Sequence, residues 1–228
     1  MSVIKDELKE LVAQSGRDFY EKGLTWGRDA GDTSLRDPET GLVYILPMPS
    51  PSLKIPTWAS ITAKDVAVVD MEGRNVGSAE VHPTVELLTH LRIYQHRPDA
   101  NALVHSHGKW TRVFAAVRQP LPALMMDQFK YTGASLISCA EIGPAGSDKV
   151  AMSAVECLGE YGKVVLLAAH GAVCLGGDMN EAMSVAEISE DMARLAVFAN
   201  TLGVAPEMTL TDLIDEKATR ESLPHLEI

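Results

Sequence analysis

The stretch Asn101-Ala102-Leu103-Val104-His105-Ser106-His107-Gly108 decides how the rest of the chain is interpreted. Its small and β-branched apolar residues predict a short strand, in which successive side chains point to opposite faces. His105 and His107 therefore project from the same face. Neutral imidazole nitrogen is a good ligand for zinc, iron and related ions, so the pair forms half of a metal site. Taken alone, the pair also fits a surface strand with two ordinary histidines.

The composition indicates a globular protein with neither a nucleic acid nor a membrane as partner. The 228 residues are 46% apolar and 22% charged, which is usual for a soluble protein with a real core. The net charge is −11 and basic residues form no cluster, which argues against nucleic acid and anionic membranes. The chain has no apolar run of membrane-spanning length and no signal peptide. Together with three distant cysteines, read as reduced, this predicts a cytoplasmic protein.

Helical and strand patterns intermix along the chain, which predicts one α/β domain over residues 1–228. The expected helices cover 3–23, 83–95, 109–117, 148–159 and 180–202. The expected strands cover 42–46, 65–70, 102–107, 136–139 and 164–169, and another short strand follows the turn at Gly31. The polar tail, 206–228, carries little pattern. Loose order and packing on a neighbouring subunit are both open for it.

Three of the seven histidines, His105, His107 and His170, stand at the end of apolar strands, where α/β folds place functional groups. Glu86, at the start of the helix expected over 83–95, is the candidate carboxylate. Three imidazoles and one carboxylate suit a divalent cation, with Zn²⁺ preferred and Mn²⁺, Co²⁺ or Fe²⁺ as alternatives. Capping of its helix is the alternative role for Glu86. His90, on the same helix face, fits an orienting or core histidine better than a ligand.

The order of these motifs resembles the class II aldolase/ribulose-phosphate epimerase family, whose members include fuculose-phosphate aldolases. The similarity spans nearly the whole chain, and the combination of motifs is far more specific than any one of them. The motifs are Pro83-Thr84-Val85-Glu86 with His90 and Tyr94, Arg97-Pro98-Asp99 before His105-Ser106-His107, and Ala169-His170-Gly171.

The resemblance implies a fold, a metal site and an assembly. The fold would be a central, mainly antiparallel sheet between layers of helices. His105, His107 and His170 would bind the metal, and Glu86 would be both a carboxylate at the metal and the general acid/base. The assembly would be a C4 homotetramer with active sites at subunit interfaces.

This chemistry predicts a lyase that cleaves a small hydroxylated ketone or ketose by a retro-aldol reaction. A cation that chelates the ketone and a neighbouring hydroxyl would stabilise the enediolate formed as the C–C bond breaks. A carboxylate beside the metal would move the proton at the carbon that becomes nucleophilic. A second acid must serve the oxygen on the aldehyde side.

Departures from the family pattern concern the phosphate-holding positions. The family's Gly-Asn turn, Ser-Gly loop and Ser-Ser pair correspond here to Gly31-Asp32, Ser50-Pro51 and Thr84-Val85. An aspartate adds negative charge where a dianion would sit, and a proline removes a backbone N–H donor. We expect Asp32, Ser50 and Thr84 to line the substrate site, and we hypothesise that the substrate is non-phosphorylated or held by other donors.

The second acid has two candidates, Asp127 and Tyr131, because the family takes an aspartate or tyrosine from a neighbouring subunit near 126–133. Epimerases of the family add a tyrosine near the C-terminus, and this chain has none after Tyr161, which favours a lyase over a 4-epimerase. A decarboxylase or dehydratase acting on a keto acid or ketose, and an oxygen-activating Fe(II) site, remain alternatives. So does a non-catalytic module like the adducin head, although that relative lacks the metal histidines present here.

Overall fold

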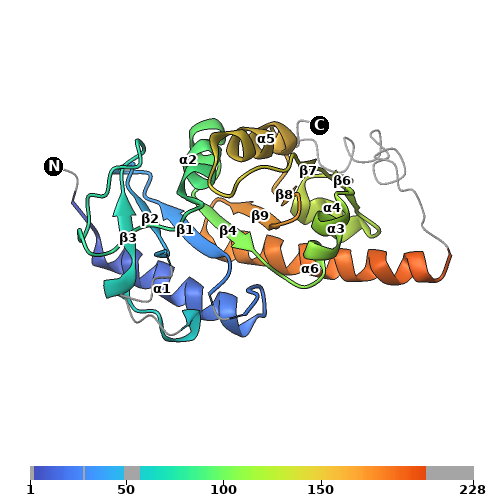
Figure 1. The fold of residues 1–228 in the computed structure, drawn as a ribbon, viewed down its shortest axis with the longest axis horizontal. Coiled ribbons are helices and arrows are strands. Elements are labelled where there is room, and N and C mark those ends of the chain that lie inside the picture. Colours follow the sequence, from blue (N-terminus) through green and yellow to red (C-terminus); the bar gives the residue numbers. More distant parts are fainter. Residues whose placement is uncertain (1–2, 28, 49–56, 204–228) are drawn as a thin grey trace, which may run out of the picture.

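The computed structural model describes residues 3–27, 29–48 and 57–203, which form a seven-stranded sheet between two layers of helices (Figure 1). The strand order is β3-β2-β1-β4-β9-β8-β7. Every neighbouring pair is antiparallel except β7 and β8. The predicted α/β fold with a mainly antiparallel central sheet is thus confirmed. In chain order the strands are β1 (Asp32–Arg36), β2 (Val43–Ile45), β3 (Ala67–Val69), β4 (Ala102–Ser106), β7 (Cys139–Ala140), β8 (Val164–Leu167) and β9 (Gly171–Gly176).

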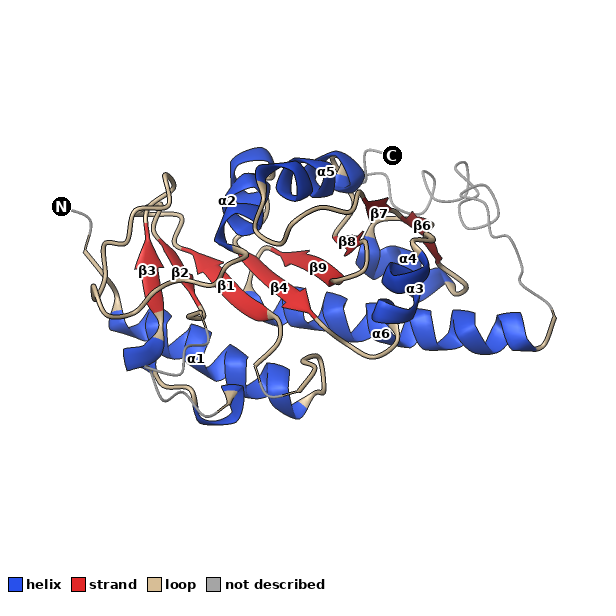
Figure 2. Cartoon of the chain, in the orientation of Figure 1, coloured by secondary structure: helices blue, strands red, loops and turns tan. Residues whose placement is uncertain are grey.

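Helices cover both faces of this sheet, as Figure 2 shows. The helices α2 (Leu87–His96) and α5 (Asp148–Leu158) pack against each other on one face. On the other face lie α1 (Asp6–Glu21) and the long α6 (Met179–Thr201). Two short helices, α3 (Thr111–Val117) and α4 (Met126–Thr132), pack on α6 beside a two-stranded antiparallel sheet of β5 (Leu121–Pro122) and β6 (Leu136–Ile137). Two single 3₁₀ turns, Trp58–Ser60 and Ala63–Asp65, precede β3.

The central strands are buried on both faces because successive side chains enter two different cores. On β4, Leu103 packs under α2 and α5, whereas Val104 packs on the α1 and α6 side. Val165 and Leu166 divide in the same way on β8. This alternation explains why these strands have continuous apolar sequences, as strands covered on both faces do.

Several elements differ from the sequence-based prediction. The helix α2 begins at Leu87 and not at Pro83, because 84–86 form a turn in which the Leu87 N–H donates to the Thr84 carbonyl at 3.2 Å. The strand expected over 164–169 ends at Leu167, and β9 follows after only three residues, in a segment to which the sequence assigned no element. The predicted cap of α5 is present, since the Ser147 hydroxyl accepts from the Val150 N–H.

Within the described ranges, no helix combines the length and the apolar character needed to cross a bilayer. The tail over 206–228 lies outside those ranges, as do Ser50 and Pro51.

Candidate metal centre

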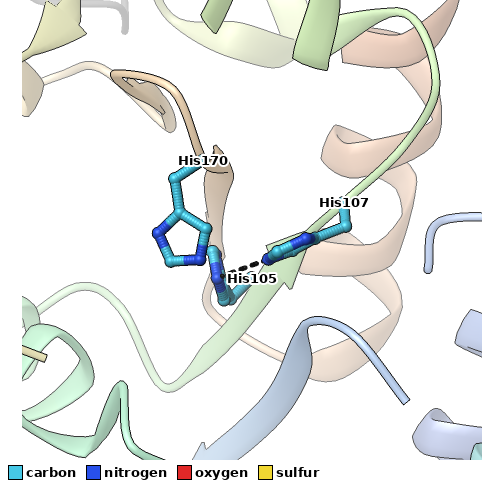
Figure 3. Close-up of side chains that lie close together, drawn as sticks. All are labelled: His105, His107 and His170. Atoms are coloured by element: carbon cyan, nitrogen blue, oxygen red, sulfur yellow. Dashed lines mark hydrogen bonds between the residues drawn. The ribbon is translucent and has the colours of Figure 1, made fainter. Parts of the chain in front are cut away.

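The two histidines of the opening stretch meet at the end of β4. His105 is the fourth residue of that strand, opposite Val173 of β9 and opposite Asp32 of β1. His107 follows the strand, and its N–H donates to the Leu24 carbonyl at 2.8 Å. The Nε2 atoms of the two imidazoles lie 3.1 Å apart. Figure 3 shows both rings turned toward one point, which His170 also faces.

His170 reaches that point from the turn between β8 and β9. The last pair of this antiparallel ladder is Leu167 and Gly171, so only three residues make the connection. Ala169 lies in the left-handed region with φ +57°, which is costly for a residue with a Cβ. A Cβ on Gly171 would stand 2.3 Å from the Ser106 carbonyl oxygen, so only glycine fits where the turn rejoins the sheet. This tight return brings His170 beside His105 and His107.

The three imidazoles form a compact cluster. Their ring centroids are 4.8 Å apart in each pair, and one nitrogen from each ring lies within 4.8 Å of the others. Burial lowers the pKa of His105 to about 4 and that of His107 to about 3, because the charged form is poorly solvated there. The Nδ1 of His105 lies 3.2 Å from the Ala172 carbonyl, which leaves Nε2 for a ligand. Neutral imidazoles with converging nitrogens are what a divalent transition metal requires.

Glu86 faces this cluster from the turn that precedes α2. Its carboxylate is 4% exposed, and its Oε1 lies 3.9 Å from Nδ1 of His170. The Thr89 hydroxyl donates to Oε2 at 3.2 Å, whereas Oε1 has no hydrogen-bond partner among the described residues. A buried, unpaired carboxylate oxygen is costly unless a cation or proton satisfies it. The donor set therefore fits a divalent cation held by three imidazoles next to a carboxylate.

Asp32 and Thr84, expected at the substrate site, lie together in the interior. Asp32 is 2% exposed and Thr84 is 7% exposed. The Thr84 hydroxyl donates to Asp32 Oδ2 at 2.7 Å, and Oδ1 lies 2.8 Å from Nε2 of His90. Burial alone would raise the pKa of Asp32, but His90 and Thr84 outweigh it and hold the pKa at about 2. Asp32 is therefore a buried anion beside His105, its partner in the sheet register.

The candidates for the second acid lie apart from this cluster. Asp127 and Tyr131 are both exposed on α4, and the Asp127 carboxylate accepts only from the neighbouring Gln128 N–H among the described residues. Within those residues, neither side chain hydrogen-bonds to Glu86 or to a histidine of the cluster. The structure thus brings the three histidines, Glu86, Asp32 and Thr84 into one region, and it leaves Asp127 and Tyr131 outside.

Two residues that shape the site could not be identified from the sequence. Glu190 on α6 accepts from the Trp110 and Thr111 N–H groups at 2.9 and 2.8 Å and from the Thr111 hydroxyl, which holds the segment that follows His107. Ser34 on β1 lies 2.7 Å from Nδ1 of His90. Their partners are distant in sequence, so no local motif marks them.

With the geometry in place, comparison with known proteins defines the class. Residues 10–197 match the family described as class II aldolase and adducin N-terminal domain, so the chain belongs to the class II aldolase family. The members that it resembles act as enzymes of several kinds. An L-fuculose phosphate aldolase of Methanococcus maripaludis is 30% identical over 184 residues, which cover 81% of this chain and 93% of that protein.

Two further relatives carry other activities. A 3-oxo-tetronate 4-phosphate decarboxylase of Haemophilus influenzae is 30% identical, with 82% of this chain and 85% of that protein covered. An L-ribulose-5-phosphate 4-epimerase of Salmonella paratyphi B is 27% identical, with 90% of each covered. Among solved structures, an L-fuculose 1-phosphate aldolase superposes with a TM-score of 0.85 at 25% identity, over 98% of this chain and 99% of that one.

Proposed function

We propose that this protein is a metal-dependent lyase that cleaves a small hydroxylated ketone or ketose by a retro-aldol reaction. One observation carries the proposal: three converging imidazoles stand beside a buried carboxylate whose Oε1 has no hydrogen-bond partner among the described residues. Membership of the class II aldolase family, with aldolase and decarboxylase relatives, supports it.

In this proposal His105, His107 and His170 hold the cation, with Glu86 as a further ligand or neighbour. A divalent ion at this position supplies a Lewis acid for the substrate carbonyl oxygen, where negative charge builds as the C–C bond breaks. Zn²⁺ is our first choice, and Mn²⁺, Co²⁺ and Fe²⁺ are alternatives. The free Oε1 of Glu86 takes or gives the proton at the carbon that becomes nucleophilic.

The acid for the aldehyde oxygen would come from a second copy of the chain. Asp127 and Tyr131 are exposed on α4, so they are available to a neighbouring subunit. Large apolar side chains are also exposed at α4, on β6 and at the C-terminal end of α6, and exposed apolar surface of this kind is common at protein interfaces. We therefore propose a homotetramer with active sites between subunits. The exposed apolar residues are Met125, Met126, Leu136, Phe198 and Leu202.

We further propose that the substrate carries no phosphate. The Thr84 hydroxyl donates to Asp32 and is not free for a substrate anion. Asp32 itself is a buried negative charge next to His105, and it would repel a dianion. The relatives named above are described as acting on phosphorylated sugars or sugar acids, so this chain would differ from them in substrate. A keto-acid decarboxylase is the second candidate, supported by the Haemophilus relative.

The first test is elemental analysis of the purified protein. We expect about one divalent ion per chain, lost in a His105→Ala/His107→Ala variant and kept in the control His96→Ala, which replaces an exposed histidine on α2. Ketoses and keto acids, with and without phosphate, would then be screened with that ion. Glu86→Gln should lower kcat by about 10²- to 10⁴-fold. If the wild-type protein bound none of Zn²⁺, Mn²⁺, Co²⁺ and Fe²⁺, the enzyme proposal would be abandoned for a non-catalytic binding module.

A further inference from the structure

Five buried polar side chains join β1 to the segment that carries Glu86, and we call them the β1–α2 polar ladder. Each is at most 7% exposed, and between them they make four contacts. Thr84 donates to Asp32 at 2.7 Å, and His90 Nε2 lies 2.8 Å from the other Asp32 oxygen. The Ser34 hydroxyl lies 2.7 Å from His90 Nδ1 and 2.7 Å from the Tyr94 hydroxyl. The members are Asp32, Ser34, Thr84, His90 and Tyr94.

One set of protons accounts for every contact of the ladder except the one between His90 and Asp32, which is not a hydrogen bond. Tyr94 donates to Ser34, Ser34 donates to Nδ1 of His90, and the remaining His90 proton sits on Nε2, facing Asp32. The Nε2 proton does not point directly at the oxygen, so this last contact is electrostatic and not a well-formed hydrogen bond. Asp32 thus accepts one hydrogen bond, from Thr84 at Oδ2, and its Oδ1 has the electrostatic contact with His90. Being 2% exposed, it has little surface to offer a substrate.

The ladder contacts both the backbone of Glu86 and the strand partner of His105. The Glu86 N–H donates to the Thr84 hydroxyl at 3.3 Å, and that hydroxyl donates to Asp32. Asp32 in turn is paired with His105 in the β1–β4 register. The ladder therefore connects the backbone of Glu86 to the strand that carries His105 and leads into His107, by a route independent of the Glu86 side chain.

We propose that Asp32 is a positioning residue, which through Thr84 and His90 fixes Glu86 relative to the three histidines. The inference rests on the proposed function, because it assumes that Glu86 works at a metal bound there. Burying a charge is costly, and where such groups persist they can specify one arrangement of the chain. Here the arrangement is the turn at 84–86. The hydrogen bonds of α2 do not fix this turn, because the helix begins only at Leu87.

The test measures Co²⁺ binding by visible absorption in purified full-length protein, because that spectrum reports the ligands and their geometry. Asp32→Asn removes the charge at constant shape, and Thr84→Val removes the hydroxyl. We expect each of these two substitutions to weaken Co²⁺ binding by about ten- to a hundredfold. Thr84→Ser, which keeps the hydroxyl, should keep the wild-type affinity and spectrum. The matched control is Asp37→Asn. Asp37 is 3% exposed and accepts from Thr40, but it lies just beyond the far end of β1.

A double-mutant cycle separates the proposed route from a direct field effect. If Asp32 acts through Glu86, then Asp32→Asn should add nothing to the loss caused by Glu86→Gln. Additive losses would overturn the proposal and point to a direct effect of the Asp32 charge on His105. Unchanged Co²⁺ binding in Asp32→Asn, or an equal loss in Asp37→Asn, would also overturn it.

Hydrogen exchange distinguishes failure of this inference from failure of the proposed function. Absence of Co²⁺ binding in the wild type would count against the proposed function, and full Co²⁺ affinity in Glu86→Gln would count against Glu86 as a ligand. In either case the ladder is tested by the hydrogen-exchange rates of the backbone amides of residues 84–90. Asp32→Asn and Thr84→Val should accelerate their exchange by about tenfold or more relative to the amides of α5, with Thr84→Ser unchanged. Unchanged exchange at 84–90 would overturn the ladder itself.

Discussion

Replacing Glu190 should cost more stability than replacing an exposed glutamate of the same helix, α6. Its Oε1 accepts from the N–H and hydroxyl of Thr111, and its Oε2 accepts from the Trp110 N–H. In Glu190→Gln the oxygen can keep the two Thr111 contacts, but the amide NH₂ then faces the Trp110 N–H. One partly buried backbone donor loses its acceptor and meets another donor. A lost acceptor of this kind costs about 1–3 kcal/mol, so we expect a loss of about 2 kcal/mol.

Urea unfolding at a fixed protein concentration measures this loss directly. For a chain of this size about 2 kcal/mol corresponds to a Tm lower by roughly 4–8 °C. The matched control is Glu187→Gln, one turn earlier on α6, whose salt bridge to Lys22 is 2.8 Å long and joins two exposed side chains. Such a pair contributes about 1 kcal/mol at most. If the two variants unfolded with the same free energy, Glu190 would not anchor the segment after His107.

Two further predictions concern the histidines. In chemical denaturation, the Ala169→Gly variant should have an unfolding free energy at least about 1 kcal/mol higher than that of Ala169→Val. The reason is that φ is +57° at this position, a region that a β-branched residue suits least. Equal stabilities would mean that the turn adopts another conformation in solution. In chelator-stripped protein, the unfolding free energy should fall as the pH drops from about 6.5 toward 4. Since the pKa values of His105 and His107 are lowered to about 4 and 3 in the fold, the unfolded chain takes up protons first. The slope per histidine is at most about 1.4 kcal/mol per pH unit, and a His105→Ala/His107→Ala variant should flatten it in the same pH series.

The fold was predictable where one strong pattern covered a whole element. The apolar run of β8 and the long amphipathic α6 are such cases, and both are present. The strand β9 was missed because the turn before it contains Ala168 and Ala169, which are apolar and carry no turn signal. Ala169 nevertheless takes up a left-handed conformation. The turn is set by the pairing of β8 with β9 and not by its own residues, and local sequence does not reveal such pairing.

The site was predictable as a set of residue types and less so as a network. The histidines are marked by their place at strand ends, and the structure brings all three together. The role of Asp32 could not be inferred in the same way, because its partners Thr84 and His90 are 52 and 58 residues away, counted from the sequence numbering. The sequence does not show whether an aspartate is buried or exposed. Only the register of β1 against β4 places this one beside His105.

The groups of the candidate site are held in place by three separate sets of contacts, and this separation determines how substitutions should disturb the site. The ladder fixes the turn of Glu86, Glu190 fixes the segment after His107, and the strained turn at Ala169 fixes His170. Each set belongs to a different element, namely β1, α6 and the β8–β9 connection. Damage to one should therefore displace one group and leave the others in place, because substitutions at distant sites that share no partner act independently. Ladder variants should lose the contribution of Glu86 while keeping the three imidazoles, whereas Ala169→Val should displace the imidazole of His170 and keep the carboxylate in place.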